Sequence, residues 1–155
     1  MSGSASLADL RVVADYQFGA GAGDALFPPD EELSVRRSTS GRPRQVTAAA
    51  GRVVSYGVDG RFTLGVEGGR RLRSALPHPE YSVVVGDESA PFVRDGKNVF
   101  AKFVADVGAA VRPRDEVVVV HDDGTVLAVG RAELSAAEMR DFDSGMAVKV
   151  RAGAD

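Results

Sequence analysis

The sequence of 155 residues contains no cysteine and no tryptophan. The absence of cysteine excludes disulfides, thiol nucleophiles and cysteine-bound zinc, and it is typical of a cytoplasmic protein, which we expect this one to be. No apolar run approaches the ~18 residues that a membrane span requires. Residues 1–6 carry neither the basic nor the apolar segment of a secretory signal, so we expect neither export nor a membrane partner.

The chain also has little that performs chemistry. Its two histidines, His78 and His121, are far apart, and neither has a partner at a metal-ligand spacing. Asp122 and Asp123 are paired carboxylates, but Gly124 after them makes a hairpin turn the better interpretation. We therefore expect a protein that is not an enzyme and holds no cofactor and no metal. Because His121 titrates near neutral pH, a minor regulatory role for it stays open.

Charge is weak overall and uneven along the chain. The formal net charge is −3. Residues 1–78 contain ten Lys/Arg and eight Asp/Glu, whereas residues 79–155 contain nine Lys/Arg and fourteen Asp/Glu. Neither half is strongly basic, so a nucleic-acid site would have to be a local patch.

The first half predicts helices combined with short strands. Ser6 can cap a helix over residues 7–18, in which apolar residues recur every three to four positions. A turn at Asp59-Gly60 is a strong hairpin signal. Four strands are expected, at residues 33–37, 44–48, 51–58 and 61–66.

A proline-rich link follows the first half. Residues 67–76 predict a short basic helix, which Pro77 and Pro79 end and stiffen. We therefore place a domain boundary here, with an α+β domain over residues 1–78 and a second domain over residues 79–155.

The second half is rich in strands. Ser135 and Glu138 form a capping box that opens a short helix ending near Gly145. About six short strands with one or two helical turns predict a small β-barrel. The clearest strands are residues 81–85, 99–104, 117–120, 125–134 and 147–151.

The stretch from Ser89 to Phe103 is the most informative part of the sequence. A short capped apolar turn ends at Gly96, and a basic alternating strand begins directly after it. This junction brings glycine backbone, two lysines, an asparagine and aromatic surface onto one small ledge. Such groups suit a phosphate and a stacked base.

Each of these residues also has a structural interpretation. Gly96 either lets an RNA backbone approach or ends the short helix in a left-handed conformation. Lys97 and Lys102 either contact phosphates or are merely solvated, and Phe100 either stacks on a base or belongs to the core. A nucleic-acid patch and a solvated helix end are likewise the alternatives for three arginines of the basic helix, Arg70, Arg71 and Arg73.

Several motifs of the second half resemble the PUA domain, an RNA-binding module named after pseudouridine synthases and archaeosine transglycosylases. They are residues 91–103, 112–117, 127–132 and 147–150. The first half resembles the region before the PUA domain in archaeal tRNA-guanine (archaeosine) transglycosylases. The motifs that carry this likeness are residues 14–19, 21–28, 41–46 and 62–65. Together the two resemblances span about residues 9–151, in the order usual for that family.

The resemblance implies an α+β domain followed by a PUA-like β-barrel that binds structured RNA, above all tRNA. The transglycosylase's catalytic barrel, with its aspartates and zinc site, has no counterpart here. At one position the family usually has a glycine where this chain has Arg114, which alters the turn or adds a phosphate contact. The RNA-binding residues that the resemblance implies are Arg94, Gly96, Lys97, Asn98, Val99, Phe100, Lys102, Lys149 and Arg151.

Two roles then remain for an RNA-binding chain. It is an accessory or separate subunit for a tRNA-modifying enzyme such as archaeosine transglycosylase, or a stand-alone protein of tRNA or ribosome metabolism. A hydrolase or small-molecule binder is a third class, which the lack of a Ser/His/Asp or metal constellation disfavours. For docking on a catalytic partner we expect an exposed apolar patch around Tyr16, Phe18 and Phe27, unless these residues fill their own core.

Overall fold

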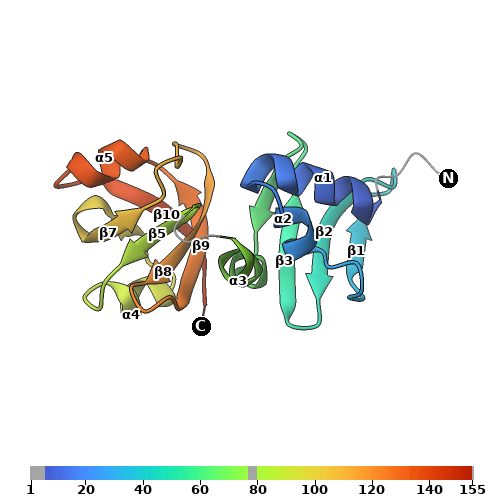
Figure 1. Ribbon diagram of the computed structural model, residues 1–155, viewed down its shortest axis with the longest axis horizontal. Coiled ribbons are helices and arrows are strands. Elements are labelled where there is room, and N and C mark those ends of the chain that lie inside the picture. The colour runs from blue at the N-terminus through green and yellow to red at the C-terminus, as the bar shows by residue number, and fades with distance from the viewer. Residues whose placement is uncertain (1–5, 77–79, 155) are drawn as a thin grey trace. The chain divides into compact units, whose positions relative to one another are not determined.

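A computed structural model describes residues 6–76 and 80–154 and divides the chain into two compact units, Met1–Leu76 and Pro77–Asp155 (Figure 1). The predicted link at residues 77–79 lies outside the described residues, so a boundary between residues 78 and 79 stays a prediction. Within the described ranges, every helix is too short or too polar to cross a membrane.

The first unit combines the four-stranded sheet that its sequence predicts with three helices, of which the sequence predicts the first and the third. The strands are antiparallel, in the order β1-β2-β3-β4. They are β1 (Ser34–Arg37), β2 (Pro43–Ala48), β3 (Gly51–Tyr56) and β4 (Phe62–Leu64). The helices are α1 (Leu7–Phe18), α2 (Ala22–Leu26) and α3 (Val66–Ala75).

The α1 helix begins where its sequence says it should. Ser6 Oγ accepts a hydrogen bond from the Asp9 N–H, and the Asp9 carboxylate accepts one from the Ser6 N–H, which completes a capping box. The buried face of α1 contains Leu10, Ala14 and Phe18.

One face of this sheet packs into the core of the unit and the other does not. Val46, Val54 and Leu64 stand opposite one another across β2, β3 and β4, and all three are buried. Figure 1 shows α1 and α2 in front of the sheet. Because side chains alternate along a strand, Gln45 and Ser55, the neighbours of these valines, point to the opposite face.

The second unit is a nearly closed barrel of six strands, which confirms the predicted barrel. Their order is β6-β10-β9-β8-β5-β7. All neighbours pair antiparallel except β5 and β8, which are parallel. The strands are β5 (Ser82–Val85), β6 (Val99–Phe100), β7 (Val104–Val107), β8 (Glu116–His121), β9 (Val126–Ala132) and β10 (Met146–Gly153). The helices are α4 (Ala90–Arg94) and α5 (Ala136–Asp141).

The strand expected at residues 99–104 is wrong. It breaks after Phe100 into a 3₁₀ turn, η1 (Ala101–Phe103), and β7 then begins at Val104. The N–H of the buried Ala101 donates to the Gly145 carbonyl at 2.9 Å, a contact from the turn before β10 that no local pattern reveals. As a result, β6 and β7 lie at opposite edges of the sheet order.

The barrel has a core made of its own residues. Its fully buried members include Val83 of β5, Val117 of β8, Leu127 of β9 and Val148 of β10. Met139 of α5 joins the same cluster. Val93 of α4 and Val99 of β6 belong to this cluster too, so the barrel core holds both sides of the α4–β6 junction.

Candidate functional site

The turn between α4 and β6 is built around Gly96. The Gly96 N–H donates to the Val93 carbonyl at 2.9 Å, and the Lys97 N–H donates to the Phe92 carbonyl at 2.9 Å. Gly96 has φ +99°, a left-handed conformation that ends the helix, so its structural role is confirmed. An added Cβ would meet no atom within 4 Å, so this backbone also faces open space.

A pocket of about 420 Å³ opens beside this turn. Three aromatic side chains from three elements face it: Phe92 of α4, Phe100 of β6 and Phe103 of η1. Phe92 is 63% exposed and Phe100 is 46% exposed. Phe100 is therefore a surface residue rather than a core residue. The remaining lining residues are Glu88, Ser89, Val93, Lys97 and Asn98.

Cations border these aromatic rings. Lys97 lines the pocket and is exposed. Lys102 is exposed as well, and its Nζ lies 5.0 Å from the centre of the Phe103 ring. Aromatic faces next to ammonium groups are the combination that holds a stacked base and its phosphate.

One polar group of the pocket lacks a partner. Ser89 is nearly buried, and its Oγ forms no hydrogen bond within the described part of the chain. A buried hydroxyl without a partner is unfavourable, and it can both donate and accept. The predicted site residues do not include four residues of this pocket, which are Glu88, Ser89, Phe92 and Phe103. The signal in the sequence that could have indicated this pocket was the aromatic residue at position 92.

Two predicted site residues hold the ledge rather than face outward. The Asn98 Oδ1 accepts a hydrogen bond from the Val150 N–H of β10 at 2.9 Å. Val99 is 1% exposed and stands opposite Val148. Asn98 and Val99 thus attach the ledge to the last strand, and the Asn98 amide also lines the pocket.

The predicted residues of β10 do not line the pocket. Lys149 is exposed and stands opposite Arg131 of β9. Arg151 donates to both carboxylate oxygens of the buried Glu116, at 2.6 and 3.1 Å, so its charge is compensated within the barrel. Arg94, at the end of α4, is half-buried.

A second polar cluster surrounds His121 at the end of β8. Its Nε2 lies 2.5 Å from Asp87 Oδ1, and its Nδ1 lies 3.1 Å from carboxylate oxygens of both Asp122 and Asp123. The hydrogen bond with Asp87 raises the pKa of His121. Hydrogen bonds from Thr125 lower the pKa of Asp123 to about 2.

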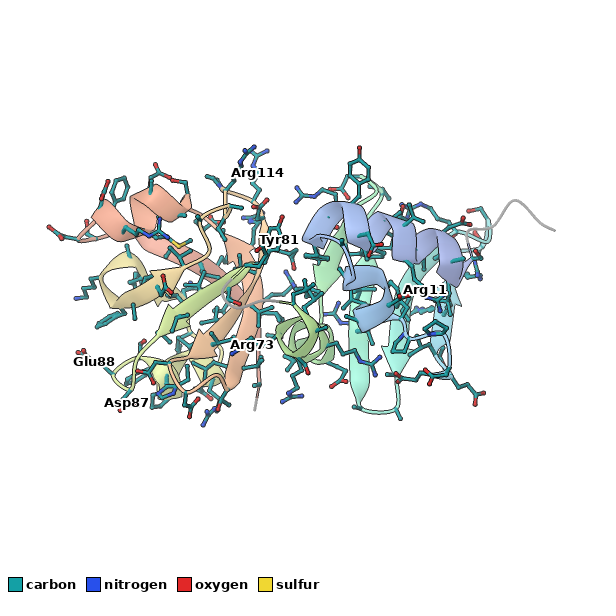
Figure 2. The ribbon with its side chains drawn as sticks, viewed as in Figure 1. Arg11, Arg73, Tyr81, Asp87, Glu88 and Arg114 are labelled. Carbon is teal, nitrogen blue, oxygen red and sulfur yellow. The ribbon has the colours of Figure 1, made fainter. Side chains whose placement is uncertain are left out.

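The same cluster includes three groups that could hold a cation. One ligand atom each from Asp87, His121 and Asp122 lies within 4.8 Å of the others. Figure 2 shows Asp87 next to Glu88 at one tip of the unit. The sequence showed the hairpin turn but not Asp87, which is 34 residues before His121.

Of the three arginines in α3, Arg71 has a structural role. Its guanidinium bonds both carboxylate oxygens of Glu31, at 2.7 and 2.8 Å, and its Nε bonds Glu67 at 2.9 Å. Glu31 accordingly raises the pKa of Arg71, and Arg71 lowers the pKa of Glu31. Arg70 is exposed, and the Arg73 Nε is buried without a partner in the described ranges.

The apolar patch expected in the first unit differs from the prediction. Phe18 and Phe27 are buried in the core, because Phe18 faces inward from α1 and Phe27 packs edge-to-face on Phe62. Tyr16, by contrast, is 94% exposed. Val12 is also exposed, and both line a pocket of about 490 Å³ whose other lining residues are Val13, Gln17, Gly60 and Arg61.

Arg114 adopts an unusual backbone conformation. Its φ is +78°, and it is the one non-glycine residue with positive φ in the described ranges. Its N–H donates to the Ala132 carbonyl at 2.7 Å. Figure 2 places Arg114 at the end of the unit away from Glu88, a lining residue of the aromatic pocket.

Comparison with known families agrees with this architecture. Residues 8–79 match the patch-forming domain C2 of tRNA-guanine transglycosylase. Residues 81–154 match the PUA domain. The chain is therefore a PUA-domain protein. More particularly, it resembles the C-terminal region of archaeal tRNA-guanine(15) transglycosylases.

The similarity to individual transglycosylases is substantial but partial. The enzyme of Thermococcus kodakarensis is 46% identical over 147 residues, which is 94% of this chain and 25% of that protein. The enzyme of Pyrococcus furiosus is 45% identical over 147 residues, 94% of this chain and 24% of that protein. This chain thus spans about a quarter of the length of the curated relatives it matches.

Solved structures share the fold at low sequence identity. A hypothetical protein from Pyrococcus horikoshii OT3 has a TM-score of 0.68 at 20% identity, covering 96% of this chain and 89% of that one. A conserved PUA domain protein from Thermoplasma acidophilum has a TM-score of 0.63 at 20% identity, covering 96% of this chain and 91% of that one.

Proposed function

We propose that this chain binds structured RNA, specifically tRNA, without catalysing a reaction on it. It does so as an accessory or separate subunit for a tRNA-modifying enzyme such as archaeosine transglycosylase. The observation that carries the proposal is the ledge of the PUA domain, where exposed aromatic rings, Lys97 and an unpartnered hydroxyl line one pocket. These groups bind a base and a phosphate, whereas they offer no nucleophile paired with a base.

The geometry of the ledge supports a proposed role for each of its residues. Phe92 and Phe100 offer ring surface for stacking, which does not depend on base identity. Lys97 and Lys102 supply the charge for phosphates, and Gly96 lets the backbone approach. Asn98 and Val99 hold the ledge against β10, and Lys149 lies on that strand. We assign Arg94 and Arg151 supporting roles. Arg94 is half-buried, and the charge of Arg151 is neutralised by Glu116.

The similarity to transglycosylases supports the second part of the proposal, the role as a subunit for a tRNA-modifying enzyme. They are named as enzymes that act on tRNA guanine, and this chain matches only a quarter of their length. The two domain matches already account for residues 8–79 and 81–154. A chain of this kind contributes to catalysis by positioning a substrate whose reacting base is handled elsewhere.

A surface of the first unit is suited to docking on such a catalytic partner. Val12 and Tyr16 of α1 are exposed, and so is Val58 in the turn between β3 and β4. Exposed apolar groups beside a pocket commonly mark interaction sites. In place of the expected patch we therefore propose a surface around Val12 and Tyr16, which line the same pocket.

Charge reversal tests RNA binding. We expect Lys97→Glu combined with Lys149→Glu to weaken affinity for a tRNA transcript by on the order of a hundredfold. The slope of log affinity against log salt should fall by about two units, one per lost phosphate contact. Filter binding at several salt concentrations measures both.

A matched control reverses two charges of the barrel outside the pocket. Arg112→Glu with Arg140→Glu should change affinity far less, since both arginines are exposed and neither lines the pocket. Equal losses in both double variants, or none in a folded Lys97/Lys149 variant, would remove the ledge from the proposal.

Co-purification tests the subunit role. We expect a catalytic transglycosylase to co-purify with this chain from native cells, and Tyr16→Asp to reduce its recovery. A base-exchange assay on tRNA with and without the chain should show faster exchange with it. If no enzyme co-purifies and exchange rates are equal, a stand-alone RNA-binding role replaces this one.

A further inference from the structure

The open face of the first sheet carries a polar row that strand pairing creates. Arg36 of β1 stands opposite Gln45 of β2, and Gln45 stands opposite Ser55 of β3. Thr63 of β4 continues the row. An irregularity in β1–β2 pairing, where Arg36 faces Gln45 but Arg37 faces Pro43, leaves Arg44 without an opposite residue.

These residues surround a small polar pocket, which we call the Arg36–Arg44 pocket. Its volume is about 250 Å³. Among the described residues that line it, none is acidic. The lining residues are Arg36, Arg44, Gln45, Ser55 and Tyr56.

The two guanidinium groups of this pocket are unengaged. Arg36 and Arg44 are exposed, and the guanidinium group of neither forms a hydrogen bond or ion pair with another described residue. Arg71 contrasts with them, since two carboxylates occupy its donors. Two exposed guanidiniums without a nearby carboxylate repel each other, and a bound anion relieves that repulsion.

The other lining groups favour an oxyanion over a base. Ser55 Oγ accepts a hydrogen bond from Arg52 Nη1 at 2.7 Å, so its own proton can be donated to a ligand. The Arg42 guanidinium lies 4.6 Å from the centre of the Tyr56 ring and covers it. Tyr56 is thus a wall rather than a free platform for stacking, unlike the phenylalanines of the PUA ledge.

We propose that the Arg36–Arg44 pocket binds phosphate groups of an RNA backbone. This inference rests on the proposed function and adds a second contact, in the other unit, to the one on the PUA ledge. Guanidinium forks match phosphate geometry, and backbone contacts position an RNA without reading its sequence. An RNA backbone is favoured over a small anion because the polar row continues past the pocket to Thr63, whose hydroxyl can contact a neighbouring phosphate of the same backbone.

The test uses the full chain with Arg36→Gln and Arg44→Gln. We expect tRNA affinity at fixed salt to fall about tenfold, and the salt slope to fall by about two units. The loss should be the same for tRNA transcripts of different sequence. Arg112→Gln with Arg140→Gln removes equal charge from exposed positions outside the pocket, and we expect it to leave the slope within about half a unit of wild type.

A conservative variant separates charge from folding. Arg36→Lys with Arg44→Lys keeps the charge but loses the planar fork, so it should retain the salt slope while losing part of the affinity. A slope equal to that of the glutamine variant would show a folding effect and overturn the proposal. Circular dichroism of each variant accompanies the binding data.

The remaining outcomes separate this inference from the proposed function. If wild type binds no tRNA, both fail. If Lys97→Glu with Lys149→Glu weakens binding while Arg36→Gln with Arg44→Gln behaves like its control, only this inference fails. The last experiment titrates the protein with inorganic phosphate alone and follows binding by the NMR shifts of the arginine Nε–H groups. Saturation below about 1 mM phosphate, a range of tight small-ligand binding, would identify a small-anion site instead.

Discussion

The two units use their sheets in opposite ways. The first unit covers one face of an open sheet and leaves the other polar, so its exposed chemistry depends on which residues the strand register aligns. The second unit curls its sheet into a nearly closed barrel around one core, so its exposed chemistry lies in a connecting turn, between α4 and β6. An open sheet presents binding groups on its strands, whereas a closed barrel presents them at its rim.

Their cations differ as well. All three lysines of the sequence, Lys97, Lys102 and Lys149, belong to the second unit, and every cation of the first unit is an arginine. Arginine offers a planar fork to a phosphate or carboxylate, and lysine offers a mobile point charge. Arginine therefore serves both a structural ion pair at Arg71 and the proposed phosphate pocket of the first unit.

The largest effects should come from the two cores. We expect Phe18→Ala to destabilise the first unit by about 4 kcal/mol and Leu127→Ala to destabilise the second by about 3 kcal/mol, because both side chains are fully buried. Amide hydrogen exchange resolved by residue measures each unit separately. Each change should speed exchange mainly in its own unit.

The fragment of residues 79–155 sharpens the same comparison. The barrel's core cluster contains only its own residues, so we predict that this fragment folds alone. Circular dichroism decides the matter: an unfolded fragment beside a folded full chain would mean that the halves share a core and that the boundary is misplaced.

The next effect concerns the ion pairs of Arg71. Arg71→Met should destabilise the first unit by about 2 kcal/mol, since it removes charge-assisted hydrogen bonds to Glu31 and Glu67 at a largely buried guanidinium. Urea unfolding measures it. Arg70→Met, an exposed neighbour with one 4.0 Å contact to Glu67, is the control and should change stability little. Equal losses would contradict a structural role specific to Arg71.

A smaller and opposite effect is expected in the second unit. Arg114→Gly should stabilise the barrel by about 1 kcal/mol, because glycine adopts φ +78° without the steric cost that a side chain carries. Thermal unfolding should show a higher melting temperature. Arg112→Gly, at a residue without positive φ, should not stabilise; if it does so equally, backbone strain is not the cause.

The smallest effect is a titration. Because Asp87 raises the pKa of His121 above its usual 6.5, the pairing stabilises fully below pH 6.5 and is lost as pH rises through the higher folded value. Asp87→Asn should move the pKa of His121 down, and NMR of the imidazole protons follows it. Glu88→Gln is the matched control. An unchanged pKa in folded Asp87→Asn protein would contradict this pairing.

Local patterns in the sequence were sufficient for much of the fold. The capped helix at Leu7–Phe18 and the capping box at Ser135 depend on hydrogen bonds between residues three apart, and both formed as predicted. The end of α4 at Gly96 depends equally on neighbours. The family likeness added the PUA barrel, whose strand order no periodicity reveals.

Contacts between distant residues were beyond any local pattern. The 3₁₀ turn at Ala101–Phe103 depends on a hydrogen bond to Gly145. His121 pairs with the distant Asp87, and the charge of Arg151 is neutralised by the distant Glu116. The spacing of Glu67 and Arg71 on the predicted helix indicates their ion pair, but nothing local in the sequence reveals the second partner of Arg71, Glu31, which is 40 residues away.

The sequence by itself therefore determined where α1, α3 and α5 begin, most strands and the turns, because these depend on short-range hydrogen bonds and on spacing. Only the tertiary structure decided which aromatic is exposed at Tyr16 and which is buried at Phe18, and that Arg36, Gln45 and Ser55 form one row. The physical reason is that burial and register are set by the packing of segments far apart in the chain. A shift of one residue in the pairing of β1, β2 or β3 would turn that strand's member of the row toward the core.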